Sequence, residues 1–173
     1  MMAVVFPAGL ALEDLRRGHK RADFGSGQQL VDAWLHTQAL QSQTKRLTVS
    51  RVLATRDGVV AGYYTLAMGQ VDFGELPADL VVKPPRRAFP VAVLAWLGVD
   101  AAYQGQGLGA RLLAQALSDC HAAGETFPLV AVVLDAVDAA SKSFYAHWDF
   151  REVPGRPMKL YLTPASLNAL IAG

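Results

Sequence analysis

The sequence predicts a mixed α/β protein in which helices pack on a single mixed sheet. The strand 91–99 is continuously apolar, as a central strand buried on both faces is, and 129–136 is predicted to be another buried strand. Helical patterns alternate with strand patterns after an initial hairpin. Just over half of the 173 residues, 52%, are hydrophobic, which is enough for a sizeable core. We therefore expect one domain over residues 1–173.

The first half of the chain predicts a helix followed by a β-hairpin. The apolar N-terminal stretch is expected to form a first strand or an arm. Ser26 and Gln29 have the spacing of a capping box, which predicts that a helix begins there. The segments 46–54 and 59–68 are rich in β-branched and aromatic residues. The turn between them contains Gly58, which can take a positive φ.

The second half predicts a loop and then the elements around the two apolar strands. Residues 74–90 hold four prolines and are expected to form a long surface loop. A helix is expected over 109–123, with Gly124 as its stop. The remaining predicted elements are a short helix at 139–148, a last strand at 158–162 and a closing helix capped by Thr163 with Pro164 at its first position.

Composition excludes several classes of protein. The 16 basic and 15 acidic residues give a net charge of +1, which does not by itself indicate a nucleic-acid binder. Cys120 is the single cysteine, so no internal disulfide forms, and a reducing compartment is favoured. No signal peptide or membrane span is apparent, which predicts a soluble, cytoplasmic protein without a membrane partner. The histidines show no metal-ligand spacing, so no metal is expected.

A glycine-rich turn joins the strand 91–99 to the helix after it. It reads "YQGQGLGARLL" from Tyr103 and places three glycines within five residues. A helix N-terminus presents unpaired N–H groups and a partial positive charge, and glycine lets a phosphate approach them. The turn therefore has the chemistry of a phosphate cradle, although the pattern alone also suits a tight strand-to-helix turn. It lacks the lysine of a nucleotide P-loop and the spacing of a dinucleotide fingerprint.

This loop resembles the signature of the GNAT acetyltransferases, Q/R-x-x-G-x-G/A, through Gln104, Gly107 and Gly109. The resemblance implies acetyl-coenzyme A as the cofactor and the GNAT fold, with a mostly antiparallel sheet splayed at the cofactor strand and helices on both faces. It places Leu97, Gly98 and Val99 along the pantetheine arm, and Gln104, Gly105, Gln106, Gly107, Leu108, Gly109 and Ala110 around the pyrophosphate.

Residues 138–150 resemble a second family pattern, N-x-x-A-x-x-x-Y-x-x-x-G-F. Tyr145 matches the tyrosine whose hydroxyl lies near the coenzyme sulfur, which implies a general acid for the leaving thiolate. Taken alone, Tyr145 also suits a core aromatic residue. Asp138 replaces an asparagine at a position of cofactor contact, and Asp149 replaces a glycine. No general base stands out, although Asp100 and Asp135 are candidates by position.

Further blocks resemble the toxin branch of these enzymes, among them "ADFGSGQQLVDAWLHTQALQ", "VVAGYYTLAMGQV" and the stretch 93–117, where Gly98 stands in place of the usual alanine. The resemblance implies an N-acetyltransferase that acetylates the amino group of aminoacyl-tRNA and thereby blocks translation. It also implies a ribbon-helix-helix antitoxin and a homodimer. Basic residues at 16–21 and in the loop before the cofactor strand suit either phosphate binding or ordinary solvated charge. The loop residues expected to contact tRNA are Lys83, Arg86 and Arg87.

Two alternative functions remain open at this point. One is an acetyltransferase that acts on a small amine or on a protein N-terminus, which would not need a basic loop. The other is a binding module that keeps acetyl-coenzyme A but has lost the chemistry. The glycine loop and Tyr145 argue against such a loss.

Overall fold

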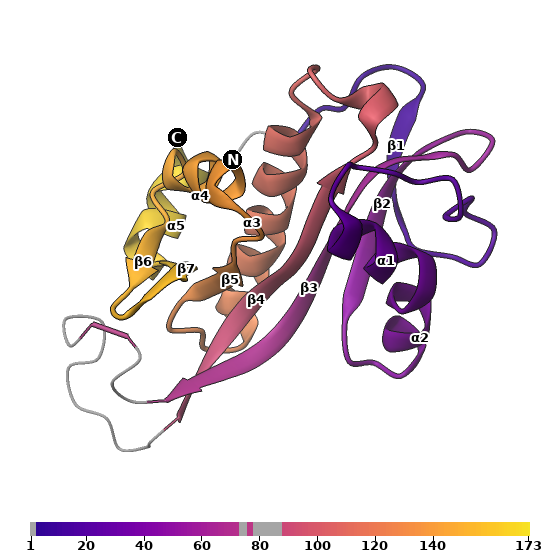
Figure 1. The fold of residues 1–173 in the computed structure, drawn as a ribbon. Coiled ribbons are helices and arrows are strands. Elements are labelled where there is room, and N and C mark those ends of the chain that lie inside the picture. The colour runs from indigo at the N-terminus through magenta and orange to yellow at the C-terminus, as the bar shows by residue number, and fades with distance from the viewer. Residues whose placement is uncertain (1–2, 73–75, 78–87) are drawn as a thin grey trace. The chain divides into compact units, whose positions relative to one another are not determined.

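The computed structural model describes residues 3–72, 76–77 and 88–173, and the predicted tRNA contacts Lys83, Arg86 and Arg87 lie outside them. Within these described residues, seven strands form one sheet in the order β1-β2-β3-β4-β5-β7-β6 (Figure 1). The strands are β1 (Leu10–Asp14), β2 (Val49–Thr55), β3 (Val60–Asp72), β4 (Ala88–Val99), β5 (Val132–Asp135), β6 (Arg151–Val153) and β7 (Arg156–Leu162). The helices are α1 (Gln29–Thr37), α2 (Ala39–Thr44), α3 (Leu108–Thr126), α4 (Ala139–Ala146) and α5 (Pro164–Ala172).

The sheet is mixed and mostly antiparallel, as predicted. The β1–β2, β2–β3, β5–β7 and β6–β7 pairs are antiparallel, and β4 pairs with β5 in parallel. The predicted hairpin is confirmed, and Gly58 in its turn has a φ of 82°. Within the described residues, no helix is long and apolar enough to cross a membrane.

The chain divides into two compact units. The first unit comprises residues 2–67 and 94–116, and the second comprises 68–93 and 117–173. Strands β3 and β4 and helix α3 each run from one unit into the other. A single domain over residues 1–173 stays a prediction.

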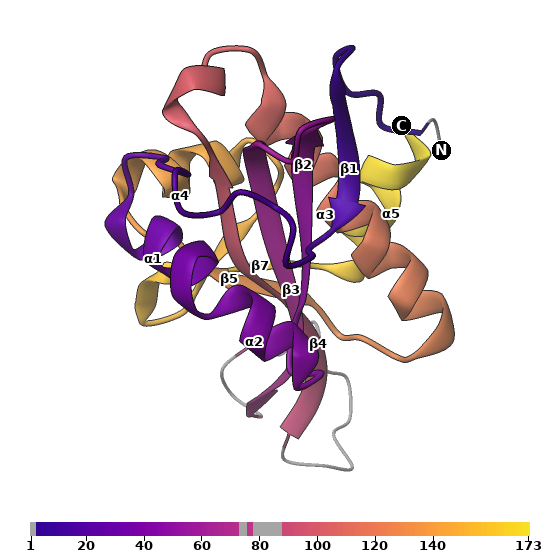
Figure 2. The same cartoon turned by 90° about the vertical axis from the view of Figure 1, so that its right-hand side faces the viewer.

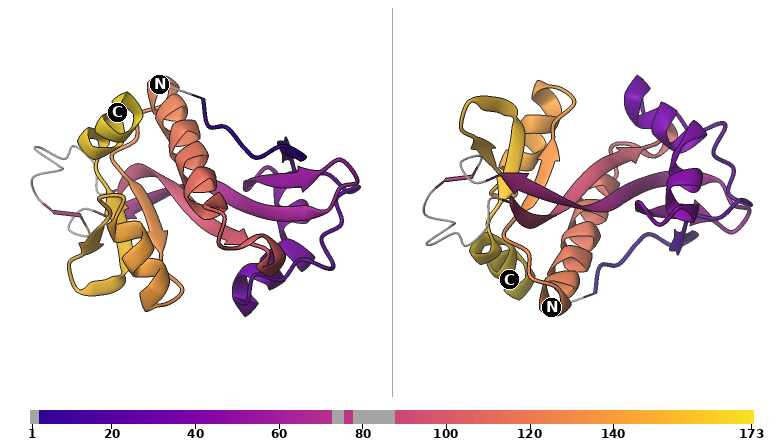
Figure 3. Two further views of the ribbon diagram at one scale, coloured as in Figure 1. Left: turned by 90° about the horizontal axis from the view of Figure 1, so that it is seen from above. Right: turned by 90° about the horizontal axis from the view of Figure 1, so that it is seen from below.

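In the first unit, neighbouring residues of β3 face different helices. The Tyr63 hydroxyl donates a hydrogen bond to the carbonyl oxygen of Val31 in α1, at 2.5 Å. Gly62 faces the other way, and a Cβ on it would lie 2.7 Å from Leu112 Cδ1 in α3. Because side chains alternate along a strand, α1 and the start of α3 cover opposite faces (Figures 2 and 3). The expected helices on both faces are therefore present in this unit.

In the second unit, β5 separates two apolar layers. Val133 stands opposite Tyr161 of β7, and both belong to a buried cluster with Val91 and Val153. The neighbouring Val132 is also buried and, with β7 and α5 residues, lines a cavity on the α3 side of the strand. Burial on both faces of β5 explains why Val132, Val133 and Leu134 are apolar, whereas Asp135 at the end of the strand is exposed.

The predicted capping box at Ser26 is wrong. Helix α1 begins at Gln29, and its N-cap residue, Gln28, makes no side-chain cap bond. The Ser26 hydroxyl instead donates to Asp32 Oδ1 at 2.6 Å, and the Ser26 amide donates to the same oxygen at 2.8 Å. A carboxylate is a stronger acceptor than the side-chain amide oxygen expected at Gln29, and the Ser26 backbone amide donates to Asp32 instead.

Several element boundaries also differ from the sequence prediction, and one strand was not predicted. Helix α3 continues past Gly124 to Thr126, because this glycine keeps a helical φ rather than the positive φ of a helix stop. Strand β4 begins at Ala88, so residues 88–90 are strand rather than loop. Strand β6 was not predicted, since its three residues are too few for a periodic signal.

Candidate functional site

The turn after β4 is held in place by Asp100. Its Oδ1 accepts a hydrogen bond from the Ala102 amide at 2.9 Å, and its Oδ2 accepts one from the Gly25 amide at 3.0 Å. The backbone adds a bond from the Ala101 amide to the Gly25 carbonyl at 2.8 Å. Asp100 therefore joins the end of β4 to the segment before α1. Both carboxylate oxygens accept backbone hydrogen bonds, which gives Asp100 a structural role in the turn, and its role as a general base stays a prediction.

Gln104 provides a second tether of the same turn. Its side-chain nitrogen donates to the carbonyl oxygens of Ser26, at 2.8 Å, and Val99, at 2.9 Å. Both N–H groups of this amide are thus used within the protein. Its conformation fixes the position of the glycines that follow, and the contact with cofactor that we expected for Gln104 stays a prediction.

The glycines of the turn differ in what they do. Gly105 and Gly107 have φ values of 79° and 76°, a region that residues with a Cβ rarely adopt. A Cβ on either would meet no atom within 4 Å, so the space beside them is open. Gly109 has no positive φ, and a Cβ there would contact only Val99, at 3.9 Å. Gly105 and Gly107 are therefore required by backbone geometry, whereas Gly109 is replaceable by alanine.

The first turn of α3 presents unpaired backbone donors. The first backbone hydrogen bond of the helix is donated by the Arg111 amide to the Gly107 carbonyl oxygen, at 3.3 Å. Among the described residues, the amides of Leu108, Gly109 and Ala110 have no acceptor, as expected for the start of a helix. Leu108 is fully buried and fixes the helix start. The open space, the free amides and the partial positive charge of the helix fit an oxyanion such as a phosphate.

The predicted cofactor strand, with Leu97, Gly98 and Val99, lies at the end of β4. The parallel ladder with β5 runs through Ala92 and Val93 and ends there. Leu97, Gly98 and Val99 belong to the first unit, and the splay of this strand away from its neighbour stays a prediction.

Tyr145 lies in α4, in the second unit. Its side chain is buried, and its ring makes edge-to-face contacts with Phe144 and Phe150, with centroids 5.2 and 5.6 Å apart. Among the described residues the hydroxyl has no hydrogen-bond partner. Burial raises the pKa of Tyr145 well above its ordinary value, so the phenol is protonated at neutral pH. The ring packs as a core residue does, while its hydroxyl stays available as a donor.

Asp138 and Asp149 lie at the two ends of α4. Asp138 is the N-cap residue, and its Oδ1 accepts a hydrogen bond from the Ser141 amide at 2.7 Å. This cap explains why the residue suits the position, and a contact of Asp138 with cofactor stays a prediction. Asp149 has a φ of 67°, in the place where the resemblance expects glycine. Its carboxylate accepts a hydrogen bond from the Ser166 hydroxyl.

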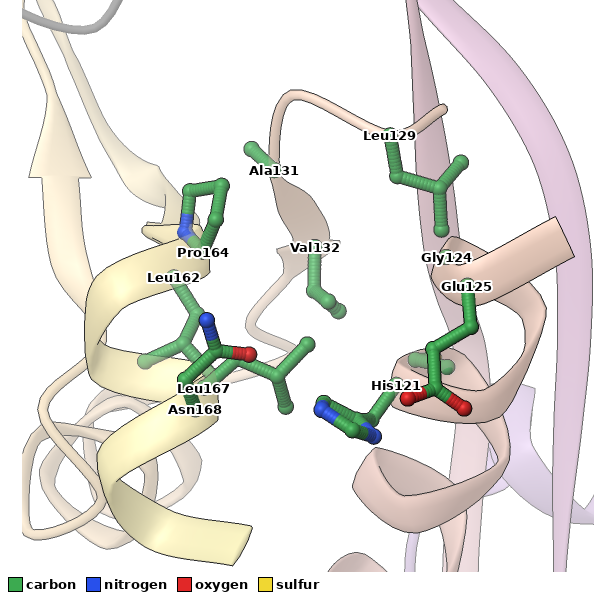
Figure 4. A pocket seen from close by; sticks show the side chains of 11 residues that line it. His121, Gly124, Glu125, Leu129, Ala131, Val132, Leu162, Pro164, Leu167 and Asn168 are labelled. Atoms are coloured by element: carbon green, nitrogen blue, oxygen red, sulfur yellow. The ribbon is translucent and has the colours of Figure 1, made fainter. Parts of the chain in front are cut away.

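A cavity of about 350 Å³ that sequence reasoning missed lies in the second unit, between the end of α3 and α5 (Figure 4). Leucine side chains line much of it, and His121, Glu125 and Asn168 lie at its edge. Cys120 also lines it, is buried as predicted, and has a pKa raised to about 12 by burial and by Asp119. Among the described residues, no group of three or more histidine, cysteine or acidic residues could hold a metal ion.

The comparisons with known proteins agree with this geometry. Residues 12–150 match the model of the Acetyltransferase (GNAT) family. The tRNA-acetylating toxin of Mycobacterium tuberculosis is 36% identical over 149 residues, which cover 86% of this chain and 88% of the toxin.

Solved structures share the fold. That of AtaT complexed with acetyl-methionyl-tRNAfMet has a TM-score of 0.85, at 24% identity, over 94% of this chain and 99% of that one. A mutant AtaT toxin bound to the C-terminus of the antitoxin AtaR and acetyl-CoA has a TM-score of 0.80, at 20% identity, over 95% and 99% of the two chains.

Proposed function

We propose, from the premise that this chain belongs to the acetyltransferase (GNAT) family, that it acetylates the amino group of aminoacyl-tRNA and acts as a toxin. The observation that carries the proposal is the 36% identity, over 86% of the chain, with a toxin described as tRNA-acetylating. An amino group that has become an amide is no longer nucleophilic. An aminoacyl-tRNA modified in this way cannot form the next peptide bond, and translation stops.

The glycine-rich turn and the start of α3, both in the first unit, fit the pyrophosphate of acetyl-coenzyme A. When bound, acetyl-coenzyme A supplies the acetyl group as a thioester. The amides of Leu108, Gly109 and Ala110 would donate to pyrophosphate oxygens, and the dipole of α3 favours the negative charge. Gly105 and Gly107 leave the approach open. The backbone of 97–99 would pair with the pantetheine arm, and an N–H there would polarise the thioester carbonyl.

Tyr145 is the group that we propose as general acid. A thiol has a pKa of about 8.5, so a leaving thiolate needs a proton from a donor that is still protonated at neutral pH. A tyrosine hydroxyl, with an ordinary pKa of about 10, is already in that form at neutral pH, and burial raises the pKa of Tyr145 further. The absence of a hydrogen-bond partner among the described residues leaves its proton free to be donated.

No carboxylate is assigned as general base. Both oxygens of Asp100 accept backbone hydrogen bonds, and the exposed Asp135 stands opposite Lys159 at the end of the β5–β7 ladder. An aminoacyl ester has an amine of low pKa, which is already neutral in large part. Water therefore suffices to take the proton.

We also propose a ribbon-helix-helix antitoxin as partner, a homodimer as the assembly and the cytoplasm as the site of action. The AtaT structure with the C-terminus of an antitoxin supports an antitoxin as a partner for a chain of this fold. Lys83, Arg86 and Arg87 stay proposed as tRNA contacts.

The experiment is acetylation of total charged tRNA by the purified protein with labelled acetyl-coenzyme A. Label on aminoacyl-tRNA that falls by about 10²- to 10⁴-fold in Tyr145→Phe supports both the substrate and the acid. Binding of acetyl-coenzyme A to both proteins serves as the control for folding. Binding without label on tRNA would exclude the tRNA substrate and move the search to small amines and protein N-termini. Undiminished activity of the variant would exclude Tyr145 as the acid.

A further inference from the structure

A depression of about 480 Å³ lies in the segment that connects β1 to α1 in the first unit. It shares no residue with the glycine loop. Its lining residues are His19, Lys20, Arg21, Ala22, Asp23 and His36. Three of them are histidine or arginine and a fourth is lysine, so the lining is rich in hydrogen-bond donors.

Arg21 is the unusual residue of this depression. Among the described residues, its Nε is the one buried side-chain nitrogen or oxygen without a hydrogen-bond partner. Its guanidinium makes a single long bond, from Nη1 to the Leu35 carbonyl at 3.5 Å, and no carboxylate of the described residues pairs with it. A half-buried guanidinium with unused donors costs the folded protein free energy unless a bound anion accepts their hydrogen bonds.

The neighbouring side chains set the charge of the depression. The Lys20 ammonium is exposed and has no ion-pair partner among the described residues. His36 donates from Nε2 to the Phe24 carbonyl at 2.7 Å, which leaves Nδ1 for another contact. His19 is different, because its Nδ1 accepts from the Arg16 amide at 2.9 Å and its Nε2 bonds Glu13 at 2.7 Å. Both nitrogens of His19 are therefore satisfied within the protein.

Asp23 is the one acid among the lining residues, and it forms no ion pair with Arg21. Lys20 and Arg21 together outweigh its charge. A guanidinium presents a planar fork of N–H groups that matches two oxygens of a phosphate, and an ammonium adds a point charge beside it. A phosphate has enough oxygens to accept hydrogen bonds from both cations at once.

We propose that this depression binds a phosphate group of the tRNA backbone, with the Arg21 guanidinium and the Lys20 ammonium as its donors. The source of the phosphate rests on the proposed function, whereas the anion site itself rests on the unpaired Arg21 alone. This contact would position the RNA without reading its sequence, as phosphate contacts do.

The test has two arms and one matched control. Arg21→Gln removes the charge and the fork, and Lys20→Gln removes the exposed charge with little risk to folding. Arg17→Gln removes an equal charge from an exposed position that does not line the depression. Binding of acetyl-coenzyme A confirms that each variant is folded.

In the first arm, the Tm of each protein is measured in phosphate and in chloride at equal ionic strength. We expect phosphate to raise the Tm of the wild type and of Arg17→Gln more than that of Arg21→Gln, because a bound ligand stabilises the folded state. An equal rise in all proteins would overturn the anion site. This arm does not depend on tRNA.

In the second arm, tRNA affinity is measured as a function of salt. We expect Arg21→Gln to weaken binding about tenfold and to reduce the slope of log K against log salt by about 1. Loss of phosphate stabilisation with an unchanged tRNA slope would assign the site to free phosphate and overturn the RNA contact. If the wild type does not bind tRNA at all, the proposed function fails, and the first arm still decides whether the depression binds an anion.

Discussion

Gly98 of β4 faces Val31 of α1 so closely that a Cβ on the glycine would lie 2.5 Å from Val31 Cγ1. The same atom would lie 3.5 Å from Phe24 Cζ and 3.6 Å from Tyr63 Cε1. Phe24, Val31 and Tyr63 are all buried and belong to one core cluster. Gly98, in the predicted cofactor strand, therefore leaves the space that the β-branched side chain of Val31 in α1 occupies.

We expect Gly98→Ala to lower the free energy of unfolding by roughly 1–3 kcal/mol, because an added methyl group overpacks this core. Val31 cannot yield easily, since a β-branched side chain is stiff at χ1. Urea denaturation measures the effect. The double variant Gly98→Ala with Val31→Ala should be less destabilised than the sum of the two single variants. Additive losses would show that the two residues do not compete for the same space.

Gly107 and Gly109 give a matched pair for the phosphate cradle. Gly107→Ala forces a Cβ into a φ of 76° and should cost about 1–2 kcal/mol of strain or shift the loop. Gly109→Ala keeps a helical residue with ordinary contacts at 3.9 Å. We expect acetyl-coenzyme A to bind to Gly107→Ala at least about tenfold more weakly, since roughly 1.4 kcal/mol is a factor of ten. The measurement is titration calorimetry.

Gly109→Ala is the control for that titration, and we expect near-normal affinity for it. Equal weakening by both substitutions would mean that the backbone conformation of Gly107 is not what the cofactor requires. Normal affinity in Gly107→Ala would remove the phosphate-cradle assignment altogether.

The sequence predicted what depends on near neighbours along the chain. The apolar run of β4, the glycines after it and the cap of α5 each carry a local signal; Thr163 accepts from the Ser166 amide at 3.0 Å, as expected. The hydrogen bonds that hold the glycine-rich loop in place carry no such local signal. Asp100 and Gly25 are 75 residues apart, and the pattern around either one does not indicate the other.

The unused donors of Arg21 escaped prediction for a related reason. In the sequence, residues 16–21 form a basic run whose members are equivalent. In the structure, Arg16 pairs with Glu13 at 2.7 Å, whereas Arg21 lines the depression and its Nε has no hydrogen-bond partner among the described residues. A buried cation needs a ligand, whereas an exposed one is solvated by water, and the sequence does not show which of these basic residues is buried.

Glu13 should make the stability of the protein depend on acid pH. A hydrogen bond from His19 and a second from Arg16 hold the pKa of Glu13 below its ordinary value. A carboxylate whose pKa is lower in the folded state stabilises the protein above its unfolded pKa, near 4.3, and this contribution is lost as the pH falls through the folded pKa.

The comparison of wild type with Glu13→Gln isolates this contribution. Unfolding by urea, measured between neutral and acid pH, should show a stability difference at neutral pH that shrinks below a pH of about 4. Because Glu13 is near the surface, salt should reduce the difference. Curves that remain parallel over the whole range would show that the ion pair contributes nothing that titrates.

Asp149 allows the strain at the end of α4 to be separated from its hydrogen bond. Its φ of 67° disfavours any residue with a Cβ, and Ser166 donates a hydrogen bond to its carboxylate. Asp149→Ala loses the bond and keeps the strain, whereas Asp149→Gly loses the bond and relieves the strain. We expect the alanine variant to be less stable than the glycine variant by about 1 kcal/mol, the usual difference at a left-handed position. Ser166→Ala removes the bond and keeps aspartate at the left-handed position, so its stability should fall between those of the alanine and glycine variants, because aspartate tolerates this conformation better than alanine does. If alanine and glycine have the same stability in thermal unfolding, the left-handed conformation does not persist at this position, and the family's glycine was replaced there without strain.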